Sequence, residues 1–227
     1  MYFEPIDGKS RTFKSLVSLS FHGGTHIELS EPAFFSPGVL PSLRRLLINR
    51  EEDDEGPISS DTDLDGIASQ LRHVSFELAW EDFDGLLDKC TNLLSLAIAA
   101  HDIVPSTRRL SKPPVGLRLW SRFEDEHSYE VMEMLEAALS SGLISGSADS
   151  CTVIFLAGVD EDDASEAGLS EWAESVGLAL EYKDGALQQG WTSVGLDYGY
   201  SEFTRWVDEE AAKREAVAEV RRIQAVV

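Results

Sequence analysis

The sequence predicts an α/β fold in which short strands and helices alternate, stacked as a solenoid around one parallel sheet. Six short segments place apolar residues at alternate positions, which is typical of strands, and helical spacing replaces that pattern between several of them. The first five segments recur every 21 to 28 residues, counted between their middle apolar residues. One strand with one helix is too small to bury both of its faces, so neighbouring units are expected to stack.

The expected strands alternate apolar residues with small or polar ones, so one face of the sheet is expected to meet solvent. A doubly wound sheet is the alternative arrangement, but its central strands are apolar on both faces. The connections at residues 77–93 and 99–115 are also short for full crossover helices. The strand segments are 16–21, 43–48, 71–76, 93–98, 115–119 and 153–155, with 178–182 as a candidate seventh.

Helices are expected between these strands, each with its apolar residues on one face. A long helix is expected from Phe203 to Val227, with an apolar stripe along it. This last helix is placed to cap the terminal repeat, because a solenoid must hide the apolar edge of its final unit. Contact with a partner is the functional alternative for the same helix. The four helices expected between strands are 63–71, 80–90, 127–143 and 169–176.

Composition and charge exclude several classes of function. The chain has 227 residues and a net charge of −22, which argues against nucleic acid or an anionic membrane as the principal partner. It contains no window of about 18 apolar residues that could cross a membrane. Two cysteines are too few for a disulfide framework and fit a reducing compartment, so a cytoplasmic or nuclear location is expected. A single domain over residues 1–227 is expected at this length.

Three segments carry a resemblance to a known family. Residues 43–48, 71–76 and 93–98 follow the pattern L-x-x-L-x-L, and residues 88–92 read Asp-Lys-Cys-Thr-Asn before the last of them. In these features the chain resembles the leucine-rich-repeat region of fungal F-box-type proteins, well over residues 16–120 and loosely over 150–183. The resemblance implies a short leucine-rich-repeat-like solenoid that binds proteins without catalysis. In that family such a region is the substrate-recognition half of a ubiquitin-ligase adaptor.

The chain departs from that family in two places. The consensus Asn after each strand is replaced by Glu51, Ala79 and His101, so the repeats are degenerate and their turns must close by other means. No counterpart of the F-box precedes Leu16. The resemblance therefore implies a substrate-binding half without its recruiting half: either the chain is a truncated or divergent relative, or the likeness is one of architecture only, which favours a protein-binding scaffold and no more.

Acidic residues gather between the second strand and its helix. Residues 51–65 hold eight carboxylates and no basic side chain, so the segment 51–63 is expected to be a solvated loop. Asp61, Asp63 and Asp65 followed by Gly66 match the start of an EF-hand calcium loop, but Arg72 stands where its bidentate Glu is needed. An acidic calcium-binding protein stays open as an alternative.

Basic residues gather in residues 103–123. This segment holds five cations and no carboxylate in an otherwise acidic chain. They are expected to pair with carboxylates of the same protein, and a patch that binds phosphate or nucleic acid is the alternative.

The sequence contains no standard motif for catalysis. Glycine-rich nucleotide loops and a G-x-S-x-G elbow are both missing from it. Cys90 and Cys151 are expected to be small core residues. No cofactor and no metal are therefore expected, and the protein is predicted not to be an enzyme. A small α/β enzyme without a recognisable motif is the competing hypothesis.

A partner is expected to bind on the open, concave face of the sheet. The side chains between the inward-facing apolar residues line that face. Trp120 and Arg118 are the principal candidates, because Trp and Arg are enriched at binding hot spots. The alternative is that a neighbouring segment covers Trp120. The residues predicted to contact a protein or peptide partner are Arg45, Asn49, His73, Glu77, Arg118 and Trp120.

Overall fold

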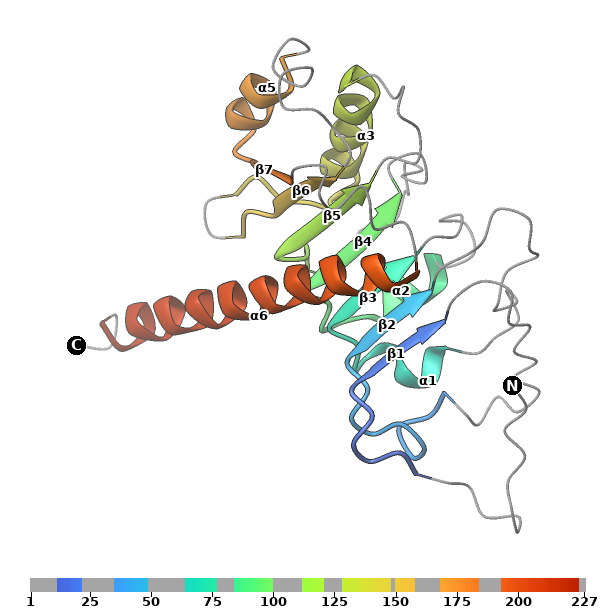
Figure 1. Ribbon diagram of the computed structural model, residues 1–227. Coiled ribbons are helices and arrows are strands. Elements are labelled where there is room, and N and C mark those ends of the chain that lie inside the picture. The colour runs from blue at the N-terminus through green and yellow to red at the C-terminus, as the bar shows by residue number, and fades with distance from the viewer. Residues whose placement is uncertain are drawn as a thin grey trace.

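A computed structural model shows a seven-stranded, all-parallel sheet with helices packed on it (Figure 1). The α/β class expected from the sequence is therefore confirmed. The structure describes residues 12–21, 35–48, 64–76, 84–99, 112–120, 128–147, 150–157, 168–183 and 193–224.

Each strand pairs with the strand that precedes it in the chain, so the sheet order is β1 to β7 without a crossover. The middle apolar residues that define the repeat lie in one row across the sheet. Leu46 is paired with Leu19 on one side and Val74 on the other, and the row continues through Leu96 to Leu117. The strands are β1 (Ser18–Phe21), β2 (Arg45–Ile48), β3 (His73–Phe76), β4 (Ser95–Ala99), β5 (Gly116–Trp120), β6 (Val153–Ala157) and β7 (Ala179–Lys183).

Within the described residues, four helices lie between strands at the positions that apolar periodicity predicts. They are α1 (Asp65–Ala68), α2 (Asp84–Lys89), α3 (Ser128–Ser141) and α5 (Leu169–Ser175). Their inward residues, such as Ile67, Leu87 and Leu135, belong to the same apolar core as alternate strand residues. These helices therefore share one face of the sheet.

The principal core lies between those helices and the sheet. Leu96 and Leu117 are fully buried in it, and strand residues on either side join them. Alternate residues of β2 to β5 lie in this core, as the alternating pattern predicts: Leu46, Ile48, Val74, Leu96, Ile98, Leu117 and Leu119. The side chain of Phe76 lies outside the described part of the structure.

The last helix, α6 (Ser193–Gln224), lies on the opposite face of the sheet (Figure 1). The sequence predicted that it caps the end of the stack, and the structure corrects this. Its side chains pack on residues of β2, β4 and β6, in the middle of the sheet, and its C-terminal part projects beyond the strands. The helix lies on the middle of that face because small residues there leave room for it. No helix within the described ranges is long and apolar enough to cross a membrane.

Candidate functional site

The face of the sheet that was expected to receive a partner holds α6 instead. Phe203, Val207 and Ala211 follow one another at four-residue spacing, so they share one side of the helix. They form a second apolar core with residues of the sheet. The buried members of this core are at most 7% exposed. The sheet side of this core consists of Leu47, Ala97, Val115 and Phe155.

Gly116 on β5 creates the space into which α6 fits. A Cβ atom at this position would lie 2.8 Å from Cγ2 of Val207 and 3.1 Å from Cε2 of Phe203. Ser95, its partner on β4, is also small and fully buried. The close approach of helix and sheet therefore depends on small residues at adjacent positions of neighbouring strands.

Aromatic rings hold the same part of α6 against β6. The ring of Phe155 lies 5.0 Å from that of Phe203 and 4.7 Å from that of Trp206, with interplanar angles of 69° and 70°. These are edge-to-face arrangements, which add to the stabilisation from buried area. The anchored part of α6 is thus held by shape and by ring contacts.

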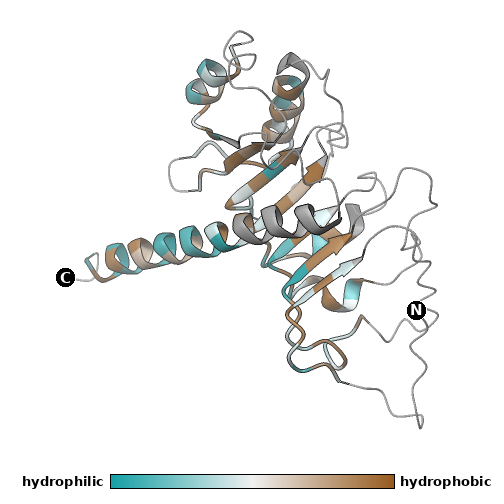
Figure 2. Cartoon of the chain, in the orientation of Figure 1, coloured by the Kyte–Doolittle hydropathy of each residue, from teal (hydrophilic) through white to brown (hydrophobic). Residues whose placement is uncertain are grey.

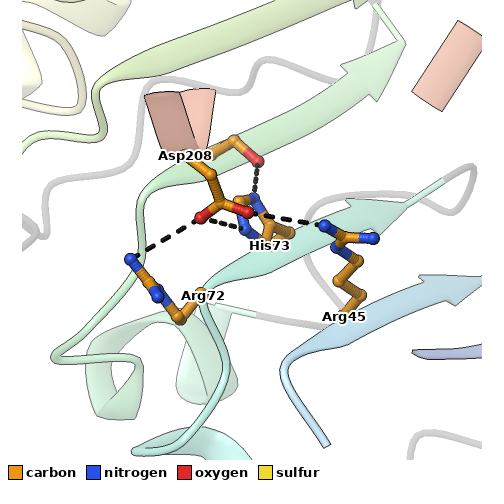
Figure 3. A network of polar contacts seen from close by, with 5 residues as sticks. Arg45, Arg72, His73 and Asp208 are labelled. Carbon is orange, nitrogen blue, oxygen red and sulfur yellow. Dashed lines mark hydrogen bonds and ion pairs between the residues drawn. The ribbon is translucent and has the colours of Figure 1, made fainter. Parts of the chain in front are cut away.

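A polar cluster lies beside this apolar contact, and Asp208 of α6 is at its centre (Figure 3). Its carboxylate lies 3.4 Å from Nη2 of Arg45, 3.6 Å from Nη2 of Arg72 and 3.2 Å from Nε2 of His73. Those three residues lie at the beginnings of β2 and β3. One carboxylate on the helix therefore contacts two neighbouring strands.

His73 is the buried member of the cluster, with 1% of its surface exposed. Burial lowers the pKa of His73 to about 4, helped by the positive charges of Arg45 and Arg72 and opposed by Asp208. The imidazole is therefore neutral at pH 7. With Nε2–H directed to the carboxylate, Nδ1 accepts a hydrogen bond from the Ser95 hydroxyl at 2.8 Å.

Ser95, His73 and Asp208 are the residue types of a nucleophilic triad, but their burial is the reverse of what catalysis needs. A nucleophilic serine must meet its substrate, and the acid behind the histidine is shielded. Here Ser95 is fully buried and the Asp208 side chain is 35% exposed. The arrangement serves to hold α6 on the sheet.

Two of the six predicted partner-binding residues, Arg45 and His73, come together in this cluster with α6. Arg118 on β5 is half-buried and already engaged in a contact. Trp120 ends β5, with its side chain outside the described part, and Asn49 and Glu77 lie outside the described residues altogether. The part of the predicted partner surface that the structure describes is thus largely occupied by the chain itself.

Asp208 was missed by sequence reasoning, which assigned that part of the helix to an apolar stripe. A usable signal was present in the strands. The pairs Arg44-Arg45 and Arg72-His73 stand at equivalent positions at the start of β2 and β3. Basic residues at adjacent positions of neighbouring strands repel one another, which favours an acidic partner from elsewhere in the chain.

The calcium alternative rests on residues that are only partly described. Asp61 and Asp63 lie outside the described residues, while Asp65 begins α1 and pairs with Lys89 of α2. In the described ranges, no three His, Cys, Asp or Glu side chains lie together in a way that could hold a metal ion.

Comparison with known protein families, with curated proteins and with solved structures found no match. The function must therefore be argued from the geometry of this chain.

Proposed function

We propose that the protein is a non-enzymatic interaction scaffold that presents the projecting part of α6 to a protein partner. The observation that carries this proposal is the exposure of three aliphatic side chains there. Val217, Val220 and Ile223 are 52%, 53% and 57% exposed. They lie at three-residue spacing, so they form one broad stripe over two turns of the helix.

The stripe begins beyond the point where α6 leaves the sheet. Arg214 donates a hydrogen bond of 2.8 Å to the carbonyl of Cys151, just before β6. Every residue from 215 to 224 is exposed. Figure 2 shows hydrophobic and hydrophilic residues alternating along this projecting part. Isolated exposed apolar residues are ordinary, but a contiguous group on one helix face is typical of an interaction surface.

The exposed stripe is separate from the stripe that anchors α6. Val220 follows Ala211 by nine residues, about two and a half helical turns, so it lies on the opposite side of the helix. Ile223 follows Val207 by 16 residues and also lies on that far side, whereas Val217 lies at its flank, about 80° around the helix from Val207. The single stripe expected from the sequence is therefore divided into an anchoring part and an exposed part. Val220 and Ile223 point away from the side that meets the sheet, and a partner has access to all three exposed side chains.

The composition of the projecting part indicates the kind of partner. Residues 215–224 carry two cations, Arg221 and Arg222, against the two carboxylates Glu215 and Glu219. The projecting part is thus close to neutral in a chain of net charge −22. We expect the partner to offer an apolar groove for the aliphatic side chains, in the manner of proteins that bind amphipathic helices.

The sheet supports the finer assignment of a leucine-rich-repeat-like solenoid, which we also propose. Its parallel strands follow in chain order, and the four helices between them share one face. Stacked strand–helix units of this kind serve as scaffolds for binding. The resemblance to F-box-type proteins would make the partner a substrate of a ubiquitin ligase, and this role stays a prediction.

Val220→Asp tests the proposal, with Ala218→Asp as its matched control. Both variants add one negative charge to the projecting part, but Ala218 lies on the other side of the helix. Affinity purification from cells should recover a specific partner with the unchanged protein and with Ala218→Asp, and lose it with Val220→Asp. Circular dichroism should show equal melting temperatures. Equal recovery with all three proteins would place the partner surface elsewhere.

A further inference from the structure

A cavity of about 550 Å³ lies at the edge of the sheet where β2 to β5 begin. Its lining residues include three that carry cationic side chains, Arg44, Arg72 and Lys112. Glu215 of α6 is the one acidic residue among the lining residues that the structure describes. We call this cavity the basic pocket. It stands apart from the exposed stripe of α6, since Val217, Val220 and Ile223 are not among its lining residues.

The two arginines of the basic pocket are neighbours because of the strand register. The carbonyl oxygen of Arg44 accepts hydrogen bonds from the backbone N–H groups of Arg72 and His73, at 2.8 and 3.0 Å. Adjacent strands are about 4.8 Å apart, so the two residues enter the sheet side by side. Like charges at such positions repel each other unless an anion lies between them.

The basic pocket carries two positive charges more than its own carboxylate can neutralise. Among the described lining residues three are cationic and one, Glu215, is acidic, in a protein whose net charge is −22. Asp208 does contact Arg72, at 3.6 Å, but it also serves Arg45 and His73. The excess charge is therefore available for a ligand with two negative charges.

We infer that the basic pocket binds a phosphate monoester. Such a group carries a charge of about −1.5 to −2 at pH 7 and has three acceptor oxygens. The guanidinium fork of an arginine matches that geometry. Arg44 is already held in place, since its Nη1 donates to the carbonyls of Pro41 and Leu43 at 3.3 and 2.8 Å, so it loses little freedom on binding. The cavity also has room for the organic part of the ester.

Titration with O-phospho-L-serine tests this inference, with L-serine as the ligand that lacks the phosphate. Ionic strength must be held constant, because salt screens exposed charges. We expect saturable binding of the phosphorylated ligand alone, measured by NMR shifts of the amides at residues 91–94. Lys112→Gln should weaken binding about tenfold, because it removes a charge-assisted contact.

Glu215→Gln provides the opposite prediction, since it removes the carboxylate that competes with the ligand. The affinity of this variant for O-phospho-L-serine should rise about threefold, a gain that a damaged fold would not produce. Arg222→Gln removes one positive charge outside the basic pocket and should leave the affinity unchanged. Absence of saturation at 10 mM ligand, or equal effects of Lys112→Gln and Arg222→Gln, would overturn the inference.

The source of the phosphate is resolved by a second ligand, a pentapeptide with a central phosphoserine. If the peptide binds more tightly than O-phospho-L-serine, the pocket recognises a phosphorylated protein segment. If both bind equally, the ligand is a small phosphate ester. Either outcome supports the phosphate assignment, and neither depends on the stripe of α6.

Discussion

Asp208 of α6 lies 3.2 Å from Nε2 of His73 on β3, although 135 residues separate them in the chain. This contact links the last helix to the sheet on the face opposite the principal core. Arg45 on β2 approaches the same carboxylate, so one acidic side chain positions the helix against two strands. The stability of α6 on the sheet can therefore be tested apart from the stability of the sheet.

Asp208→Asn should loosen α6, because the charge that Arg45, Arg72 and His73 share is removed. We expect the free energy of unfolding to fall by about 1 kcal/mol, a modest value because the carboxylate is partly exposed and screened by water. Hydrogen exchange should speed up in residues 203–211 and stay constant in the strands. Glu209→Gln is the control. It removes a charge from an exposed neighbour and should leave stability unchanged or slightly higher, since the whole chain is acidic.

Stability should fall between pH 6.5 and about 4 because of His73. Its ordinary pKa of 6.5 is lowered to about 4 in the folded protein, chiefly by burial. Between pH 6.5 and about 4, His73 is therefore protonated in the unfolded chain but stays neutral in the folded chain. The contribution of His73 is fully present above pH 6.5 and is lost as the pH falls to about 4, by about 3 kcal/mol.

Denaturant unfolding at several pH values checks this, with His73→Gln as the comparison. That variant keeps a hydrogen-bonding side chain but cannot titrate, so its stability should change less between pH 6.5 and 4. The variant is expected to be less stable at pH 7. The informative quantity is the change of its free energy of unfolding with pH. Parallel curves for the two proteins would show that His73 does not control acid stability.

Gly116→Val should displace α6 from the sheet. The first added carbon would already lie 2.8 Å from Val207, and the branched side chain brings two more methyl groups to the same place. We expect faster proteolysis within α6 and a melting temperature lower by several degrees. Gly38→Ala is the control, because its added methyl group would have 3.8 Å to the nearest atom, Oγ of Ser36. Equal protease sensitivity of both variants would contradict the close contact at Gly116.

Leu96→Ala should destabilise the whole domain. Leu96 is fully buried in the principal core, and its row is paired with Val74 and Leu117 on the neighbouring strands. Removing the side chain leaves a cavity, so the free energy of unfolding should fall by about 2–5 kcal/mol in denaturant titrations. A change below about 0.5 kcal/mol would mean that Leu96 does not pack in a core. Lys89→Ala, at an exposed position of α2, should change stability little.

Cys90 should resist alkylation in the folded protein. It is 4% exposed, and burial raises the pKa of its thiol to about 12, so almost no thiolate is present at pH 8. Cys151, which is only partly buried, provides the internal comparison. Iodoacetamide followed by mass spectrometry should label Cys151 first and label Cys90 only after unfolding.

The strands and their inward faces were determined by local pattern. Alternation of apolar residues has a period of two, and it can be read within one segment, as for Leu93, Leu96 and Ile98. The four helices between strands were predictable for the same reason, although their ends differ by several residues. Regular spacing of the segments also predicted that neighbouring strands lie side by side, since each unit must bury its apolar face against the next.

The position of α6 was decided only in the tertiary structure. Its apolar residues show that it must be covered somewhere, but they do not show by which surface. That surface includes Leu47, Ala97, Gly116 and Phe155, which come from four different strands and meet only through the sheet register. The contact of Asp208 with His73 follows from the same packing. Such contacts depend on the shape and charge of an assembled face, and no single segment of the sequence contains that information.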